Sequence, residues 1–312
     1  MSTSSAPSSP GRPAIIGETL FDKFSDGRRA LGGAPFNVAW NLRGMGLDPL
    51  FLSAVGDDAE GGEIKERLRF WGVDQSWFQT VPGKNTGEVQ VTLRGGEPTY
   101  EILRDRAYDY LRTPADVASQ TDVALLYHGS LAWRSETTRQ AIRETRASLH
   151  VPVFVDINVR KGCFDESWAP ELLGGAEWAK LNQDELSRIA VRDLVDDAAI
   201  EAAVETLRNN FGCRNVWLTR AERGAFGFLL DERGRRRTIH APAPPVPQMA
   251  DAIGAGDAFS AVAIAGALRK EDAEITLRRA VRFAAKVCGI RGAVSENPDF
   301  YASDEVVATE PR

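Results

Sequence analysis

Cysteine and histidine are scarce in this sequence, and long apolar runs are absent. The three cysteines, Cys163, Cys213 and Cys288, are far apart and show no metal-ligand spacing, which excludes a disulfide framework and suits a reducing cytoplasm. The three histidines show no such spacing either. No segment is long enough to span a bilayer, and the first ten residues lack the apolar core of a signal peptide. We therefore expect a cytoplasmic protein with no membrane partner and a disordered tail at residues 1–12.

Acidic residues outnumber basic ones, with 44 Asp and Glu against 38 Lys and Arg. The formal net charge is −6 at pH 7, which argues against a nucleic-acid partner because such a partner favours a basic face. Two common phosphate-binding motifs are missing as well. The chain has no G-x-x-x-x-G-K-[ST] loop, and no G-x-G-x-x-G pattern with a third glycine after Gly256. These absences weigh against P-loop kinases and Rossmann dehydrogenases.

What the chain does contain is a regular alternation of short apolar runs and helical patterns. This rhythm predicts a mainly parallel sheet with helices on both faces, and 43% hydrophobic residues suffice for a sizeable core. We expect one α/β domain over residues 13–312. The expected strands are 14–17, 49–55, 123–127, 153–156, 178–181 and 216–219, and the expected helices are 37–45, 60–71, 135–148, 184–190 and 197–209.

One region departs from this rhythm. Residues 87–93 alternate polar and apolar side chains, a glycine-containing turn follows at 95–97, and residues 99–103 continue the chain, which predicts a β-hairpin. Alternation with period two implies one solvated face. We therefore expect a small β lid that projects from the main sheet, with strands from about 21–31 and 86–104; an ordinary edge hairpin is the alternative.

The most informative segment is the run Asp-Ala-Ile-Gly-Ala-Gly-Asp at 251–257. A proline-rich stretch precedes it and an apolar stretch follows it, so a buried helix should begin near Asp257. The unpaired amides at a helix start, here those of Gly254, Ala255 and Gly256, favour an anion such as phosphate. Asp257 beside that anion suits a general base that removes a proton from a hydroxyl. The alternative is an Asp that caps a core helix after a glycine turn.

This run resembles the D-x-x-G-A-G-D signature of the PfkB, or ribokinase-like, family of sugar and nucleoside kinases. A second segment, Gly32 to Ala39, is similar to the G-G-x-x-x-N-x-A element of that family. The resemblance implies a ribokinase-like α/β fold with a β lid, and a kinase that transfers the γ-phosphoryl group of ATP to a primary hydroxyl of a small sugar. It also implies that the lid forms a homodimer contact, as it often does in this family.

The resemblance extends to residues that would bind the sugar. Hydrogen-bonding side chains at Asp22 and Asn37, and the open backbone at Gly32 and Gly33, match the sugar site. Arg104 and Arg160 lie in segments similar to the R-x-x-[SA]-A-D and D-x-N-x-R elements of fructokinases, so fructose is the first acceptor to test. Either arginine would otherwise be a surface ion-pair partner. A sugar acid (2-keto-3-deoxygluconate), a nucleoside and a non-catalytic sensor of the same fold remain alternatives.

The nucleotide and cation sites follow from the same resemblance. Asn182 and Glu185 match an N-x-x-E element, in which the glutamate helps to hold Mg²⁺ mostly through water; the same spacing is that of a helix capping box. Thr219 and Gly224, with Gly256, would approach ATP, although Ala221 stands where the turn motif T-x-G-x-x-G has its first glycine.

A monovalent cation such as K⁺ would lie near the signature and a later loop, at positions that match Asp251, Ile253 and Ser295.

Overall fold

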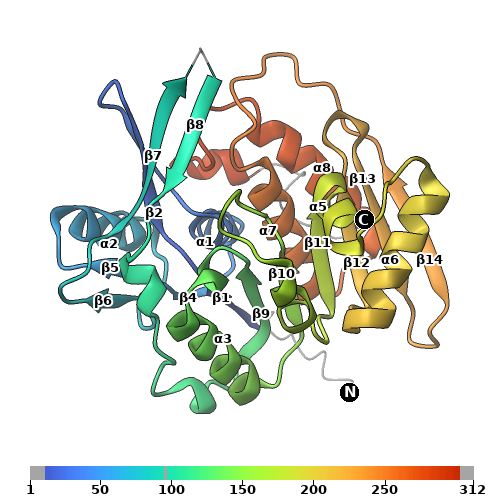
Figure 1. Cartoon of the computed structure of the whole chain (residues 1–312), viewed down its shortest axis with the longest axis horizontal. Coiled ribbons are helices and arrows are strands. Elements are labelled where there is room, and N and C mark those ends of the chain that lie inside the picture. Colours follow the sequence, from blue (N-terminus) through green and yellow to red (C-terminus); the bar gives the residue numbers. More distant parts are fainter. Residues whose placement is uncertain (1–10, 95–96, 303–312) are drawn as a thin grey trace, which may run out of the picture.

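The computed structural model describes residues 11–94 and 97–302 (Figure 1). Residues 1–10 of the expected tail, and 95–96 of the expected turn, lie outside the described residues. Arg12, at the end of the expected tail, is the first residue of strand β1.

A sheet of eight strands forms the centre of the described part of the chain, in the order β14-β13-β12-β11-β10-β9-β1-β4. The strands from β4 to β12 along this order pair in parallel, whereas β13 and β14 are antiparallel to their neighbours. This confirms the mainly parallel sheet. The strands are β1 (Arg12–Ile16), β4 (Leu50–Leu52), β9 (Val123–Gly129), β10 (Val153–Asp156), β11 (Trp178–Asn182), β12 (Asn215–Thr219), β13 (Ala225–Leu230) and β14 (Arg236–Ala241).

Helices cover both faces of this sheet. Along β1, Ile15 packs into one hydrophobic cluster with residues of α1, α2, α7 and α8, whereas Ala14 and Ile16 pack into a second cluster with residues of α3 to α6. The strands are therefore buried on both sides, as parallel strands in α/β proteins are. The helices are α1 (Ala34–Gly44), α2 (Ala59–Trp71), α3 (Glu136–Leu149), α4 (Ala169–Leu172), α5 (Gln183–Ala190), α6 (Asp197–Phe211), α7 (Ala255–Leu268) and α8 (Ala273–Val287).

A second sheet stands apart from the central one and corresponds to the expected lid. Its order is β3-β2-β7-β8, and the β7–β8 hairpin projects from the body of the molecule (Figure 1). The predicted hairpin is thus present, and the 21–31 stretch joins it through a parallel pairing of β2 with β7. The strands are β2 (Leu20–Phe24), β3 (Arg29–Gly32), β7 (Gly87–Arg94) and β8 (Glu97–Ile102).

Two expectations about the elements were wrong. The single strand expected over 49–55 is divided at Ser53, because the following β5 (Ala54–Gly56) leaves the central sheet and pairs with β6 (Gln79–Val81). Helix α1 begins at Ala34 rather than Asn37, since Pro35 lies in the first turn, where a helix tolerates the missing amide hydrogen.

Short 3₁₀ helices occupy Ala107–Tyr110, Val117–Ser119, Ala132–Arg134, Glu166–Trp168, Ala221–Arg223 and Pro298–Tyr301.

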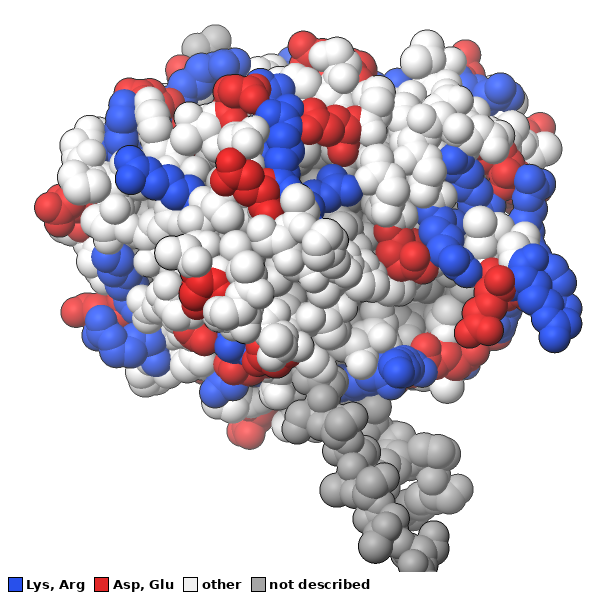
Figure 2. Space-filling view, turned by 90° about the horizontal axis from the view of Figure 1, so that it is seen from below, with Lys and Arg blue, Asp and Glu red and all other residues white. Residues whose placement is uncertain are grey.

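The surface carries charges of both signs. On the face shown in Figure 2, lysine and arginine side chains alternate with aspartate and glutamate rather than gathering in one basic area. None of the helices in the described residues combines the length and apolar character needed to cross a membrane.

Candidate active site

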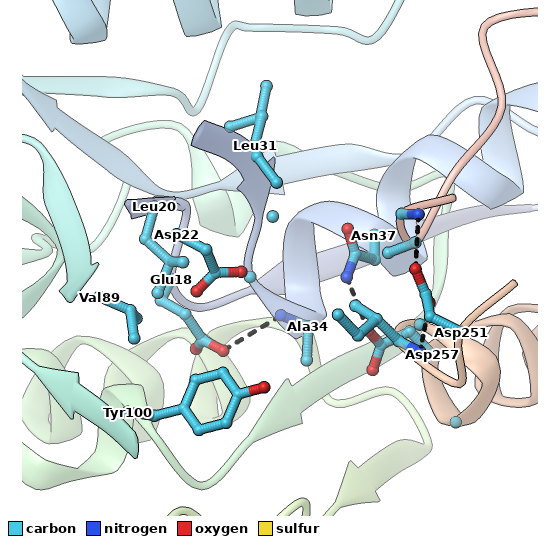
Figure 3. A pocket seen from close by; sticks show the side chains of 18 of the residues that line it. Glu18, Leu20, Asp22, Leu31, Ala34, Asn37, Val89, Tyr100, Asp251 and Asp257 are labelled. Carbon is cyan, nitrogen blue, oxygen red and sulfur yellow. Dashed lines mark hydrogen bonds between the residues drawn. The ribbon is translucent and has the colours of Figure 1, made fainter. Parts of the chain in front are cut away.

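A cavity of about 1030 Å³ lies between the lid, the start of α1 and the start of α7 (Figure 3). Ten of the residues predicted from the sequence line it, namely Asp22, Gly32, Gly33, Asn37, Arg160, Asp251, Ile253, Gly254, Gly256 and Asp257. The other predicted residues, Arg104, Asn182, Glu185, Thr219, Gly224, Ala255 and Ser295, are not among its lining residues. Segments that are remote in the sequence therefore meet around one cavity.

Asp257 is held in place at the start of α7. Its side chain is 6% exposed, and the Asn37 side chain donates a hydrogen bond from Nδ2 to Asp257 Oδ2 at 2.7 Å (Figure 3). Burial raises the pKa of Asp257, and the nearby charge of Asp156 raises it further, whereas the Asn37 hydrogen bond opposes the shift. A carboxylate with a raised pKa in a cavity is suited to accept a proton.

The backbone in front of Asp257 is shaped by glycine. Gly254 has φ 80°, a conformation that residues with a side chain rarely adopt, and a Cβ atom there would lie 2.4 Å from the Cα of Ala293. Both the backbone conformation and the close contact therefore disfavour a side chain at this position. The Ala255 amide donates to the carbonyl of Ala252 at 3.3 Å, whereas the amides of Gly254 and Gly256 have no acceptor among the described residues. Two of the three amides expected to bind an anion therefore keep free donors at a helix N-terminus.

An ion pair that the sequence analysis did not identify lies behind this turn. Lys180 Nζ is 3.1 and 3.2 Å from the two carboxylate oxygens of Asp156, and Ser260 Oγ donates to Asp156 at 2.8 Å. A Cβ atom on Gly256 would lie 2.9 Å from Lys180 Nζ. Burial alone would lower the pKa of Lys180, but Asp156 and other nearby carboxylates raise it, so the ammonium group stays charged beside the helix start.

Two carboxyl groups line the cavity on the side of the lid. Asp22, on β2, was predicted; burial raises its pKa and Arg160 opposes the shift. Glu18, in the turn between β1 and β2, was missed, although it lies two residues after a buried strand, where polar residues often face a site. It is 4% exposed, its Oε1 accepts a hydrogen bond from the Ala34 amide at 3.3 Å, and burial raises its pKa to about 7.

The arginines differ in position. Arg160 is exposed, lines the cavity and makes no ion pair within 4.0 Å among the described residues. Arg291, which the sequence analysis did not single out, also lines the cavity. Arg104 instead donates to the carbonyl of Gly162 at 3.3 Å, in the loop that follows Arg160. Only one of the two predicted arginines therefore lies on the cavity wall.

The predicted magnesium residue takes part in a helix cap. Asn182 caps α5 by accepting from the Glu185 amide at 2.9 Å, and Glu185 Oε2 accepts from the Asn182 amide at 2.8 Å. Glu185 Oε1 accepts from the Val159 amide at 2.7 Å. The capping box is therefore formed, and the role of Glu185 toward Mg²⁺ remains a prediction. Among the described residues, no group of three or more His, Cys, Asp or Glu side chains is arranged to hold a metal ion.

The turn expected to approach ATP has an unusual backbone. Ala221 has φ 48°, in the left-handed region that glycine adopts without strain. Gly224 has φ 82°, and a Cβ there would lie 2.0 Å from the Ala241 carbonyl oxygen. Thr219 Oγ1 donates to the Leu181 carbonyl at 3.3 Å. The turn therefore has the conformation that a glycine at position 221 would favour, although the residue is alanine.

The residues expected at a monovalent cation site make separate sets of hydrogen bonds in the structure. Asp251 joins two loops, because its carboxylate accepts from the Ile253 amide at 2.8 Å and from the Gly292 amide at 3.1 Å (Figure 3). The Ser295 carbonyl accepts from the Trp40 indole at 2.9 Å. A cation at this place remains a prediction.

The parallel sheet, the separate lid and the cavity at the start of α7 define a ribokinase-like α/β fold. The family model for pfkB family carbohydrate kinases matches residues 16–299. The chain is 28% identical to a fructokinase of Klebsiella pneumoniae over 274 residues, which cover 82% of this chain and 84% of that protein. The chain therefore belongs to the PfkB family, whose members are phosphotransferases with an alcohol group as acceptor.

Solved structures agree with this fold. The fructokinase of Vibrio cholerae O395, bound to fructose, ADP and a calcium ion, superimposes with a TM-score of 0.75 at 20% identity and covers 91% of this chain and 94% of its own. The nucleoside kinase of Burkholderia thailandensis in complex with inosine superimposes with a TM-score of 0.73 at 18% identity and covers 90% and 91%. The same fold thus accommodates a sugar in one relative and a nucleoside in another.

Proposed function

We propose that this protein is an ATP-dependent kinase that phosphorylates a small sugar, and that fructose is the first acceptor to test. The observation that carries the proposal is the position of Asp257 on the cavity wall, where Asn37 Nδ2 lies 2.7 Å from its carboxylate and two nearby amides have no acceptor in the described part of the chain. A carboxylate beside free amides is what phosphoryl transfer to an alcohol requires. The similarity to the Klebsiella pneumoniae fructokinase supports fructose.

In the proposed reaction the acceptor hydroxyl lies within reach of Asp257. Asp257 takes the hydroxyl proton while a new bond forms between the hydroxyl oxygen and the γ-phosphorus of ATP, and the bond from that phosphorus to the bridging oxygen breaks to release ADP. The amides of Gly254 and Gly256 and the nearby ammonium group of Lys180 offset the charge of the migrating phosphoryl group.

Magnesium would accompany ATP. Both carboxylate oxygens of Glu185 already accept hydrogen bonds from backbone amides, so Glu185 would contact the ion through water. This arrangement fits Mg²⁺, which would be held mainly by phosphate oxygens and water. When bound, Mg²⁺ supplies counter-charge to the phosphates. The predictions of K⁺ activation and of a homodimer through the lid are tested by the dependence of the rate on KCl and by sedimentation.

The charged side chains of the cavity leave a neutral sugar and a sugar acid as alternatives. Glu18, Asp22 and Asp257 line it, and carboxyl groups bind hydroxyl donors well but repel a carboxylate. Arg160 and Arg291 also line it, and neither makes an ion pair within 4.0 Å among the described residues, so they could pair with the carboxylate of a sugar acid. Fructose is tested first because of the similarity to a fructokinase, and 2-keto-3-deoxygluconate is the second candidate.

The test is the release of ADP from Mg-ATP with fructose, ribose, 2-keto-3-deoxygluconate and inosine as acceptors. We expect Asp257→Asn to lower kcat by about 10²–10⁴ while the protein remains folded, because the amide keeps the shape but accepts no proton. The matched control is Asp57→Asn, at an exposed position before α2. If no acceptor stimulates ADP release while calorimetry shows that a sugar binds, the protein is a sensor rather than a kinase.

A further inference from the structure

One carboxyl oxygen of Glu18 receives no hydrogen bond from the described residues. The side chain is 4% exposed and lines the cavity, and its Oε1 accepts from the Ala34 amide. Its Oε2 is buried and has no hydrogen-bond partner in the described part of the chain. Buried polar atoms are usually hydrogen-bonded, because an unmet partner costs free energy. This oxygen belongs to a side chain that lines the cavity, so a group that enters the cavity can become its partner.

The surroundings of Glu18 place it in the acceptor part of the cavity. In Figure 3 its carboxyl group lies beside Ala34 at the start of α1, with Asp22 close by, and with Asn37 and Asp257 beyond Ala34. The charged groups that act on it are Arg160, which favours its ionised form, and Asp257, which disfavours it. Because its pKa is raised to about 7 by burial, Glu18 can either donate or accept a hydrogen bond near neutral pH.

We propose that Glu18 is a specificity-determining residue, and that its unpartnered oxygen binds a hydroxyl group of the phosphoryl acceptor. This inference rests on the proposed kinase function. A purely structural role would be complete with the single bond from the Ala34 amide, and it would leave the second oxygen unexplained. A hydroxyl suits the site because it both donates and accepts, whichever form the carboxyl group takes.

The test compares Glu18→Gln and Glu18→Ala with the wild-type protein, using whichever of the four acceptors named above gives the fastest ADP release. Glu18→Gln retains an oxygen that can accept from the Ala34 amide. We expect the KM for the acceptor to rise about 10- to 100-fold in Glu18→Ala and by less in Glu18→Gln, whose amide can still donate to a hydroxyl, with the KM for ATP within about twofold of wild type in both. The matched control is Glu66→Gln, at an exposed position on α2.

Deoxy analogues of the same acceptor, each lacking one hydroxyl, identify the group that Glu18 binds. The wild-type protein should discriminate against one of these analogues, and Glu18→Ala should lose that discrimination. A merely structural role would change thermal unfolding and would affect both KM values alike. An unchanged acceptor KM in both variants, with an active wild type, overturns the role of Glu18 alone; a wild-type protein that phosphorylates none of the acceptors overturns the kinase function, and this inference with it.

Discussion

Asn37 and Asp257 are 220 positions apart in the sequence, yet Asn37 Nδ2 lies 2.7 Å from Asp257 Oδ2. Asn37 belongs to the first turns of α1, and Asp257 to the first turn of α7. The hydrogen bond therefore joins the helix that follows the lid strands to the helix that begins at the proposed phosphate site. It fixes the direction of the carboxylate and stabilises its ionised form.

The first prediction concerns this hydrogen bond. Asn37→Leu removes the donor that lowers the pKa of Asp257, so that pKa, already raised by burial, should rise further. Because the base acts only when ionised, the acid limb of the profile of kcat/KM against pH should move to higher pH. The control is Asn41→Leu, one turn along α1, where the side chain accepts from the Tyr301 hydroxyl at 3.0 Å. An acid limb that stays in place in Asn37→Leu would show that Asn37 does not tune the base.

The second prediction separates backbone strain from a steric clash. Gly46 and Gly254 have nearly the same φ, 79° and 80°, but a Cβ at Gly46 meets nothing within 4 Å, whereas at Gly254 it meets Ala293 at 2.4 Å. Gly46→Ala should cost about 1–2 kcal/mol in the free energy of unfolding and leave kcat unchanged. Gly254→Ala should cost more and lower kcat, because the start of α7 must shift. Denaturant unfolding and ADP release measure the two effects, and equal losses of activity in the two variants would contradict the prediction.

The third prediction uses the left-handed alanine of the nucleotide turn. Ala221→Gly should raise the free energy of unfolding by about 0.5–1 kcal/mol, because relief of the strain at φ 48° exceeds the extra chain entropy of glycine. The KM for ATP should stay within about twofold, since the turn already has this conformation. Ala202→Gly, inside α6, is the control with the opposite sign, expected to cost about 1 kcal/mol. A destabilised Ala221→Gly variant would refute the strain argument.

Much of the fold was predictable from local pattern. The continuous apolar run at 153–155 predicted the buried central strand Val153–Asp156, and alternation predicted the β7–β8 hairpin, because burial on two faces and burial on one face leave different periodicities. The break at Ser53 was not predictable, since both halves of the 49–55 run are buried and apolar and only their partners differ.

The site was predictable where a motif brings its own backbone geometry. The glycine run before Asp257 fixes a helix start, so the free amides and the carboxylate follow from a few adjacent residues. Glu18 and Lys180 were missed because each is a single charged residue next to an apolar run. Their meaning lies in contacts with distant segments, Ala34 for one and Asp156 for the other, which no local pattern records.

The last prediction concerns the buried pair of Lys180 and Asp156. Lys180→Met leaves the Asp156 carboxylate, which is 0% exposed, without its counter-charge, and within residues 11–94 and 97–302 only the Ser260 side chain still donates to it. The free energy of unfolding should fall by about 3–5 kcal/mol, and changing Asp156 to Asn in the same chain should restore part of it. By comparison, Lys84→Met breaks an exposed pair with Asp105 at 2.6 Å and should cost far less, because solvent screens exposed charges.

Lys180 should also influence the chemistry, because its charge lowers the pKa of Asp257 while Asp156 raises it. Lys180→Met should therefore move the acid limb of kcat/KM to higher pH, and the additional Asp156→Asn change should move it back, since both charges are then absent. Urea unfolding and pH–rate profiles of the single and double variants measure both effects. If the two single changes are simply additive in stability and neither moves the limb, the pair is not coupled to the proposed base, and Lys180 serves only to neutralise Asp156.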